Sequence, residues 1–219
     1  MTILENVLKD NKEFVENFEG EEMSHHAAKK LAILTCMDCR LIDFFEPALG
    51  LKRGDAKIVR NAGNSIVGED AIRSIGAALY NLGAEEVMVV GHTECGMAGA
   101  DAEALKEKML ARGIAEEDIA KYDLAEWIGG FESEEENVKN VVEKIKNHPL
   151  IPDVPVHGLI IDIVTGEHLR KANIQTTLTN GQRHLIGLEV NRCGLLLLID
   201  GDRRNLGGVE RTLNHERDV

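Results

Sequence analysis

LAILTCMDCR, residues 31–40, is a short apolar run that ends in metal-binding residue types, and VMVVGHTEC, residues 87–95, repeats this arrangement. Short apolar runs are typical of buried parallel strands. Residues just past the carboxyl ends of such strands line the crevice where α/β proteins bind their ligands. Here two strand ends would bring thiols and an imidazole together, which is the outline of a zinc site. The residues concerned are Cys36, Asp38, Cys39 and Arg40 after the first run, and His92, Glu94 and Cys95 after the second.

The other apolar patterns extend these two runs into an alternating series of strands and helices. Residues 69–82 carry apolar side chains at helical spacing before Gly83, and Gly50 suits the end of an earlier helix. Ser133 and Glu136 form a capping-box pattern before another helix. Alternating strands and helices predict an α/β fold with a mostly parallel β-sheet flanked by helices. The predicted strands are 31–35, 56–60, 87–90 and 156–164, and the predicted helices are 3–18, 41–49, 69–82, two within 99–121, and 134–147.

Composition divides the chain near residue 166. Residues 1–166 carry 17 Lys+Arg and 31 Asp+Glu. Residues 167–219 carry 8 Lys+Arg and 7 Asp+Glu, so the strong negative charge is confined to the first part. We therefore predict a zinc domain over 1–166 and a C-terminal extension of unassigned fold over 167–219. Within the extension, the pattern predicts a hairpin over 185–200 and a mobile end. Cys193 in this segment is assigned no function.

The overall charge of the chain argues against nucleic acid as a partner. The net charge is −13, and one Trp, two Tyr and five Phe offer few stacking surfaces for bases. A small anion or a neutral gas remains compatible with this charge, because the local charge of a site matters more than the total.

The sequence shows no pattern of export or membrane insertion. The N-terminal stretch lacks a basic start and an apolar core, and the longest aliphatic run, Leu195–Ile199, is too short to span a bilayer. Four Cys, two of them three residues apart, are more typical of metal ligands than of disulfides. We therefore predict a cytoplasmic protein without a membrane partner.

Cys36, His92 and Cys95 are the candidate metal ligands. Zinc binds thiolates and imidazoles in a tetrahedron, and a catalytic zinc site keeps one position open for water. His-x-x-Cys after one strand lets two side chains reach one ion, while Cys36 supplies a third ligand from the neighbouring strand end. The predicted cofactor is Zn²⁺.

Asp38 and Arg40 are the candidate catalytic residues. Asp38 lies two residues past Cys36, so its carboxylate could bind the zinc as a fourth ligand or accept a hydrogen bond from a zinc-bound water. Arg40 could hold the carboxylate away from the metal through a bidentate, charge-assisted pair. Zinc lowers the pKa of bound water to about 7, so Asp38 would then orient a hydroxide.

Cys39 leaves two alternatives open. Cys36 and Cys39 form a Cys-x-x-Cys, so four side chains could make a closed Cys3His structural zinc site, or the pair could be a redox dithiol. No thioredoxin-like helix start follows the pair, and adjacent residues of an extended turn point in different directions. A separate metal site at His25 and His26 is a weaker hypothesis, and solvated side chains are expected there.

Three motifs together resemble those of the β-class carbonic anhydrases, above all the small archaeal and bacterial branch. They are CMDCR at 36–40, RNAGN at 60–64 and GHTECGM at 91–97, and the resemblance extends over about residues 3–166. It implies a zinc-dependent hydration of CO2 to bicarbonate and a proton through a zinc-bound hydroxide. The family's zinc ligands correspond to Cys36, His92 and Cys95, and its Asp–Arg dyad to Asp38 and Arg40.

The resemblance also implies a homodimer or homotetramer, with the N-terminal helix packed on a partner subunit. Some relatives bind the Asp to zinc in a closed form, and others hydrolyse CS2 or COS with the same side chains. Cys39 departs from the family pattern, where Ser or Ala is usual, and the segment after Gly166 has no counterpart in the small branch.

Overall fold

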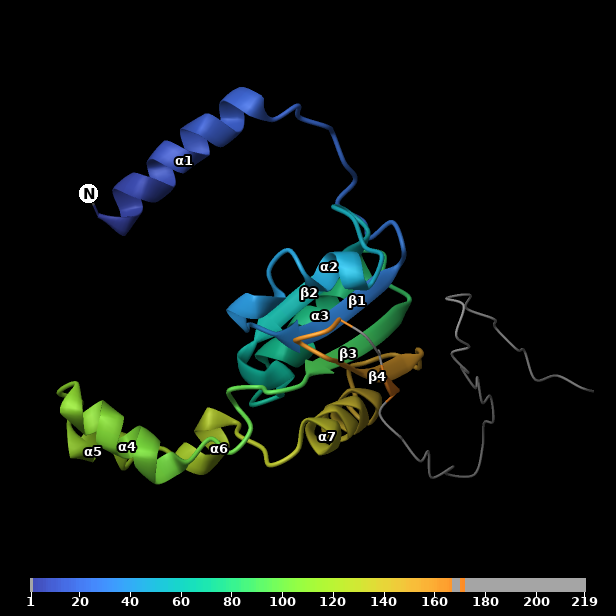
Figure 1. Ribbon diagram of the computed structural model, residues 1–219. Coiled ribbons are helices and arrows are strands. Elements are labelled where there is room, and N and C mark those ends of the chain that lie inside the picture. The colour runs from blue at the N-terminus through green and yellow to red at the C-terminus, as the bar shows by residue number, and fades with distance from the viewer. Residues whose placement is uncertain (1, 167–169, 172–219) are drawn as a thin grey trace, which may run out of the picture. The chain divides into compact units, whose positions relative to one another are not determined.

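The structure, a computed structural model, describes residues 2–166, 170 and 171 (Figure 1). These residues all belong to one compact unit, Met1–Ile174. The predicted hairpin over 185–200, the predicted mobile end and Cys193 lie outside the described residues. The domain boundary at residue 166 stays a prediction.

The sheet has the order β2-β1-β3-β4-β5, and its first four strands are parallel. This confirms the predicted parallel sheet. The fourth strand ends at Ile161, before the predicted end at 164, and β5 adds an antiparallel edge that the sequence pattern did not predict. The strands are β1 (Leu31–Cys36), β2 (Ala56–Asn61), β3 (Glu86–His92), β4 (Val156–Ile161) and β5 (Arg170–Lys171).

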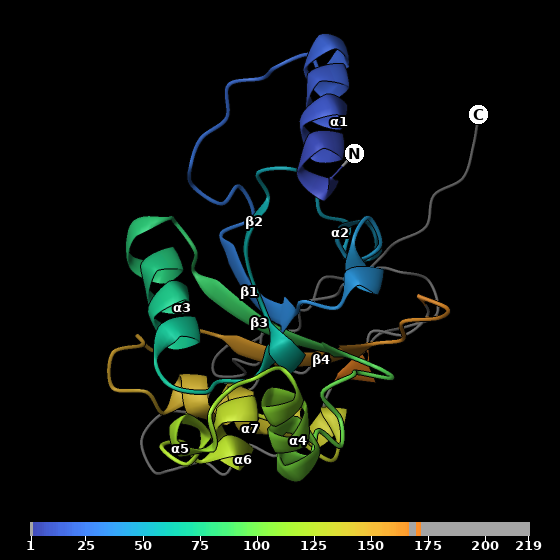
Figure 2. The same cartoon turned by 90° about the vertical axis from the view of Figure 1, so that its left-hand side faces the viewer.

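Helices cover both faces of the sheet, as expected for buried parallel strands. On one face, α3 (Asp70–Asn81) and α7 (Glu134–Lys146) pack against alternate strand residues such as Leu34 and Val89. On the other face, Phe45 of α2 (Phe45–Ala48) packs with Ile33 and Ile161. Figure 2 shows α3 and α7 on one side of the strands and α2 on the other.

Local signals set the ends of several helices. The Ser133 hydroxyl accepts the Glu136 N–H at 3.4 Å, and Gly50 and Gly83 have the left-handed φ values of 62° and 77°, as predicted. The predicted helix over 41–49 is shorter, because a 3-10 turn, η1 (Cys39–Leu41), precedes α2. Residues 99–121 contain the two predicted helices, α4 (Ala102–Ala111) and α5 (Glu116–Ile119), and the pattern missed α6 (Leu124–Ile128).

The N-terminal helix α1 (Ile3–Asn17) begins with a capping box, in which Thr2 and Glu5 exchange side chain–backbone hydrogen bonds. All of its residues are exposed, including a stripe of large apolar side chains. Among the described residues, no helix combines the length and the apolar character that crossing a bilayer requires.

Candidate metal centre

Parallel pairing of β1 with β3 brings the candidate ligands to one edge of the sheet. Thr35 pairs with Val90, so Cys36 ends β1 close to His92 at the end of β3. Cys95 returns to the same point from the turn after β3. The ligand atoms of Cys36, His92 and Cys95 lie within 4.8 Å of one another, and all three residues are buried. We call these three residues the Cys2His cluster.

The geometry of the Cys2His cluster fits a tetrahedral zinc ion. The two Sγ atoms are 3.9 Å apart. Zn–S bonds of about 2.3 Å at the tetrahedral angle would place two sulfurs about 3.8 Å apart. His92 Nε2 is buried and has no hydrogen-bond partner among the described residues. A buried nitrogen without a partner is costly, and a metal ion would use its lone pair.

The backbone determines which nitrogen of His92 faces the cluster. His92 Nδ1 lies 2.8 Å from the carbonyl oxygen of Thr93. Because a carbonyl oxygen can only accept, Nδ1 carries the proton, and the neutral ring therefore has its lone pair on Nε2. A backbone carbonyl that fixes the tautomer in this way is a common feature of metal-ligating histidines.

The two buried thiols share a hydrogen bond. The contact with Cys95 lowers the pKa of Cys36, and the backbone N–H groups of Asp38 and Gly63 lower it further, against the effect of burial. The same thiol–thiol contact raises the pKa of Cys95. One thiol thus ionises readily, and a bound cation would favour release of the second proton.

The turn after β2 supports Cys36, a role that the sequence pattern did not assign. Gly63 has a left-handed φ of 68°, and a Cβ there would lie 2.9 Å from the Cβ of Met97. Asn137 of α7 donates to the Gly63 carbonyl at 2.8 Å. This bond holds the Gly63–Asn64 peptide, which directly follows the peptide whose N–H faces Cys36. The signal in the sequence was a glycine in the turn that follows a strand.

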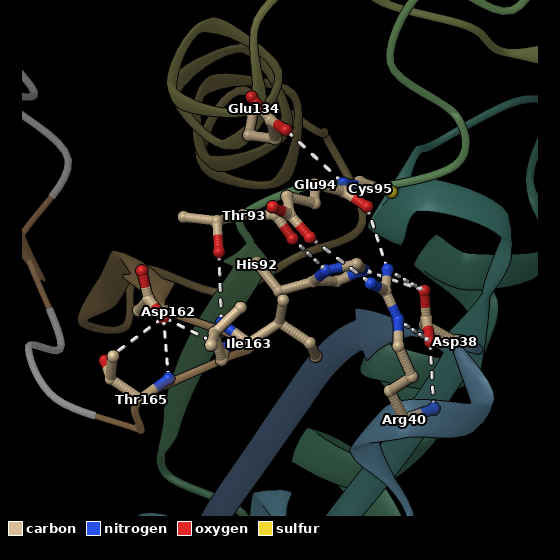
Figure 3. A network of polar contacts seen from close by, with 11 residues as sticks. Asp38, Arg40, His92, Thr93, Glu94, Cys95, Glu134, Asp162, Ile163 and Thr165 are labelled. Atoms are coloured by element: carbon tan, nitrogen blue, oxygen red, sulfur yellow. Dashed lines mark hydrogen bonds and ion pairs between the residues drawn. The ribbon is translucent and has the colours of Figure 1, made fainter.

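Asp38 and Arg40 form the predicted bidentate pair (Figure 3). Arg40 Nε donates to Asp38 Oδ1 at 3.0 Å, and Arg40 Nη2 donates to Asp38 Oδ2 at 2.8 Å. These bonds from Arg40 lower the pKa of Asp38 to about 2, so the carboxylate is ionised at neutral pH. Arg40 Nη2 also donates to the Glu94 carbonyl at 2.8 Å, which joins the turns after β1 and β3.

Asp38 lies next to the Cys2His cluster, with Oδ2 3.8 Å from His92 Nε2. Cys39 does not join the cluster; it is exposed at the start of η1. His25 and His26 are exposed and contact each other, with ring centroids 4.4 Å apart. In the part of the chain that the structure describes, the Cys2His cluster is the one group of three such side chains with ligand atoms this close.

These features define an α/β protein with a buried Cys2His site at the carboxyl edge of a parallel sheet. Residues 31–168 match the family model described as carbonic anhydrase. YvdA of Bacillus subtilis, provisionally named a carbonic anhydrase, is 46% identical over 178 residues, which cover 76% of this chain and 90% of YvdA. A carbon disulfide hydrolase of Acidianus is 35% identical over 163 residues, covering 66% of this chain and 78% of the relative.

Solved structures show the same relationship. The crystal structure of a β-carbonic anhydrase from Trichomonas vaginalis superposes with a TM-score of 0.75 at 38% identity, covering 78% of this chain and 98% of that one. The chain therefore belongs to the β-carbonic anhydrase family. This confirms the family resemblance, the predicted fold and the prediction of a carbonic anhydrase-type enzyme.

The burial of the cysteines predicts different effects of the same substitution. Cys36→Ser should lower the zinc content, because it replaces a buried thiol of the Cys2His cluster. Cys39→Ser should leave about one zinc per chain, because Cys39 is exposed and outside the cluster. Zinc per chain, measured by inductively coupled plasma mass spectrometry on purified protein, checks both. Zinc loss in Cys39→Ser would contradict the three-ligand site and favour the closed Cys3His alternative.

Proposed function

We propose that the chain is a cytoplasmic enzyme that binds zinc through Cys36, His92 and Cys95 and hydrates CO2 to bicarbonate and a proton. The observation that carries this proposal is a buried set of three ligands beside a carboxylate that an arginine holds. Zinc with three protein ligands keeps a fourth position for water and lowers the pKa of that water to about 7.

Asp38 orients the attacking water. Its carboxylate is ionised and can only accept hydrogen bonds, so a water beside His92 would point a hydrogen toward Asp38 and a lone pair toward the substrate. Arg40 occupies both carboxylate oxygens and so keeps Asp38 from serving as a fourth ligand. A closed form with Asp38 on the metal would require Arg40 to release it.

Apolar side chains next to the cluster favour a small uncharged substrate. Cys36 and Cys95 belong to the same buried apolar cluster as Val90 and Ile161, with Met97, Phe131 and Leu159 packed against it. Such surroundings accept CO2 at little desolvation cost, whereas a charged substrate would lose its hydration there.

A second candidate function is the hydrolysis of CS2 or COS. The 35% identical relative from Acidianus is named a carbon disulfide hydrolase. Stopped-flow CO2 hydration by zinc-quantified protein, with CS2 and COS consumption followed in parallel, separates the two functions. We expect turnover of CO2 with one zinc per chain. Consumption of CS2 or COS by zinc-loaded protein that is inactive with CO2 would replace our proposal with the second function.

Replacement of Asp38 by Asn tests the orienting role. Asp38→Asn keeps the size of the side chain and removes its charge, so kcat should fall about 10–100-fold while the zinc content stays unchanged. Asp70→Asn is the matched control, because Asp70 also pairs with an arginine, Arg73, but is exposed. The control should keep the wild-type kcat. An unchanged kcat in Asp38→Asn would remove Asp38 from the mechanism.

We also propose that the chain forms a homodimer or homotetramer through α1. The apolar stripe of this helix is exposed, with side chains that a soluble monomer would normally bury. Its members are Ile3, Leu4, Val7, Leu8, Phe14 and Val15, followed by Phe18. A second copy of the chain would cover this stripe.

The stripe predicts how substitutions in α1 change the assembly. Val7→Glu combined with Leu8→Glu should reduce the mass measured by light scattering to that of a smaller species, because two buried contacts become charged. Lys9→Glu changes the net charge by the same amount at a polar position of α1 and should leave the mass unchanged. A monomeric wild-type protein, or no effect of the double substitution, would contradict this assembly.

A further inference from the structure

The hydrogen bonds between β3 and β4 continue regularly up to Thr93. His92 pairs with Ile161, and the Thr93 N–H donates to the Ile161 carbonyl at 3.0 Å. In a parallel ladder, a residue bonds to the two residues that flank its partner. The same rule holds at the start of the strands, where Val87, paired with Val156, donates to Pro155. The next regular bond would therefore join the Ile163 N–H to the Thr93 carbonyl.

The structure departs from the ladder at that bond. The Ile163 N–H donates instead to the Thr93 hydroxyl, Oγ1, at 3.0 Å (Figure 3). The Thr93 carbonyl is thereby released from the ladder, and it accepts the bond from His92 Nδ1 at 2.8 Å. Asp162, the residue before Ile163, accepts the N–H groups of Val164 and Thr165 at its Oδ1, so the chain turns after Ile163.

We propose that Thr93 is a positioning residue for the metal ligand His92, and this inference rests on the proposed function. The Thr93 hydroxyl takes the place of its own carbonyl in the pairing with β4. The carbonyl is then free to hold the His92 ring, with Nε2 directed at Cys36 and Cys95. Ile163 is buried, so its N–H needs an acceptor in any case.

Loss of the hydroxyl would bring two donors to one carbonyl. The Ile163 N–H would then approach the Thr93 carbonyl and draw that peptide toward β4. The direction in which the carbonyl meets the His92 ring would change, and with it the direction of Nε2. Serine can supply the same acceptor, whereas valine matches the shape of threonine without it.

Three variants of the full-length zinc protein test this inference: Thr93→Val, Thr93→Ser and Thr93→Ala. The measured quantity is the rate of zinc transfer to a chromophoric chelator. Thr93→Val and Thr93→Ala should lose zinc about 10–100-fold faster than wild type, and Thr93→Ser should restore the slow loss. Thr165→Val is the matched control, because it removes a hydroxyl bonded to Asp162 in the same turn and should leave zinc loss unchanged.

A second measurement needs neither a substitution at Thr93 nor an assay of enzyme activity. Long-range ¹H–¹⁵N NMR of the metal-free wild-type protein, with the His92 signals assigned through His92→Gln, should show Nδ1 protonated and its proton protected from exchange. An Nε2-protonated ring, or equal zinc loss from Thr93→Val and Thr93→Ser, would overturn the inference. Wild-type protein that holds zinc but does not hydrate CO2 would contradict the proposed function. The comparison of zinc-loss rates among the Thr93 variants would still test the positioning role.

Discussion

Parallel pairing of β1 with β3 determines where each candidate ligand lies. The two strands run in register from Leu31 opposite Glu86 to Thr35 opposite Val90. Their carboxyl ends therefore lie side by side, and the strands themselves place Cys36 and His92 close together. Side chains alternate between the faces of a strand, so a slip by one residue would exchange the side chains of β1 between its two buried faces and move Cys36 out of the cluster. The same strand register is thus needed both for the packing of the core and for the assembly of the site.

Two residues with unusual backbone conformations lie at this edge of the sheet. Glu94 has φ 55° between His92 and Cys95, Asn64 has φ 48° beside Gly63, and non-glycine residues adopt such values at an energetic cost. The conformation at Glu94 reverses the chain, so that Cys95 returns to the cluster, and its carbonyl accepts a bond from Arg40. The well-packed core on both sides of the sheet holds these turns in place. The stability of the core is therefore what maintains the geometry of the ligands.

The sequence predicted the four parallel strands and the grouping of Cys36, His92 and Cys95 because both depend on local patterns: apolar runs and the residues that follow them. It predicted the Asp38–Arg40 pair because the two residues are close in the chain. It did not reveal the roles of Thr93 and Asn137, since these depend on contacts with Ile163 and Gly63, 70 and 74 residues away. It also missed α6, whose five residues are too few to show a helical period, and β5, which is two residues long.

The charges around the site bear on the choice between CO2 and CS2. Burial decreases from His92, at 0% side-chain exposure, to Asp38 at 14% and Arg40 at 45%, so the dyad extends from the cluster toward solvent. Hydration of CO2 yields an anion, which must leave the site, whereas hydrolysis of CS2 releases neutral products. Arg40 pairs with Asp38 and lies 3.6 Å from the Glu94 carboxylate, so two carboxylates surround one guanidinium and the local charge is net negative. Such a charge repels an anion, so bicarbonate formed beside Asp38 would be driven outward rather than held by Arg40.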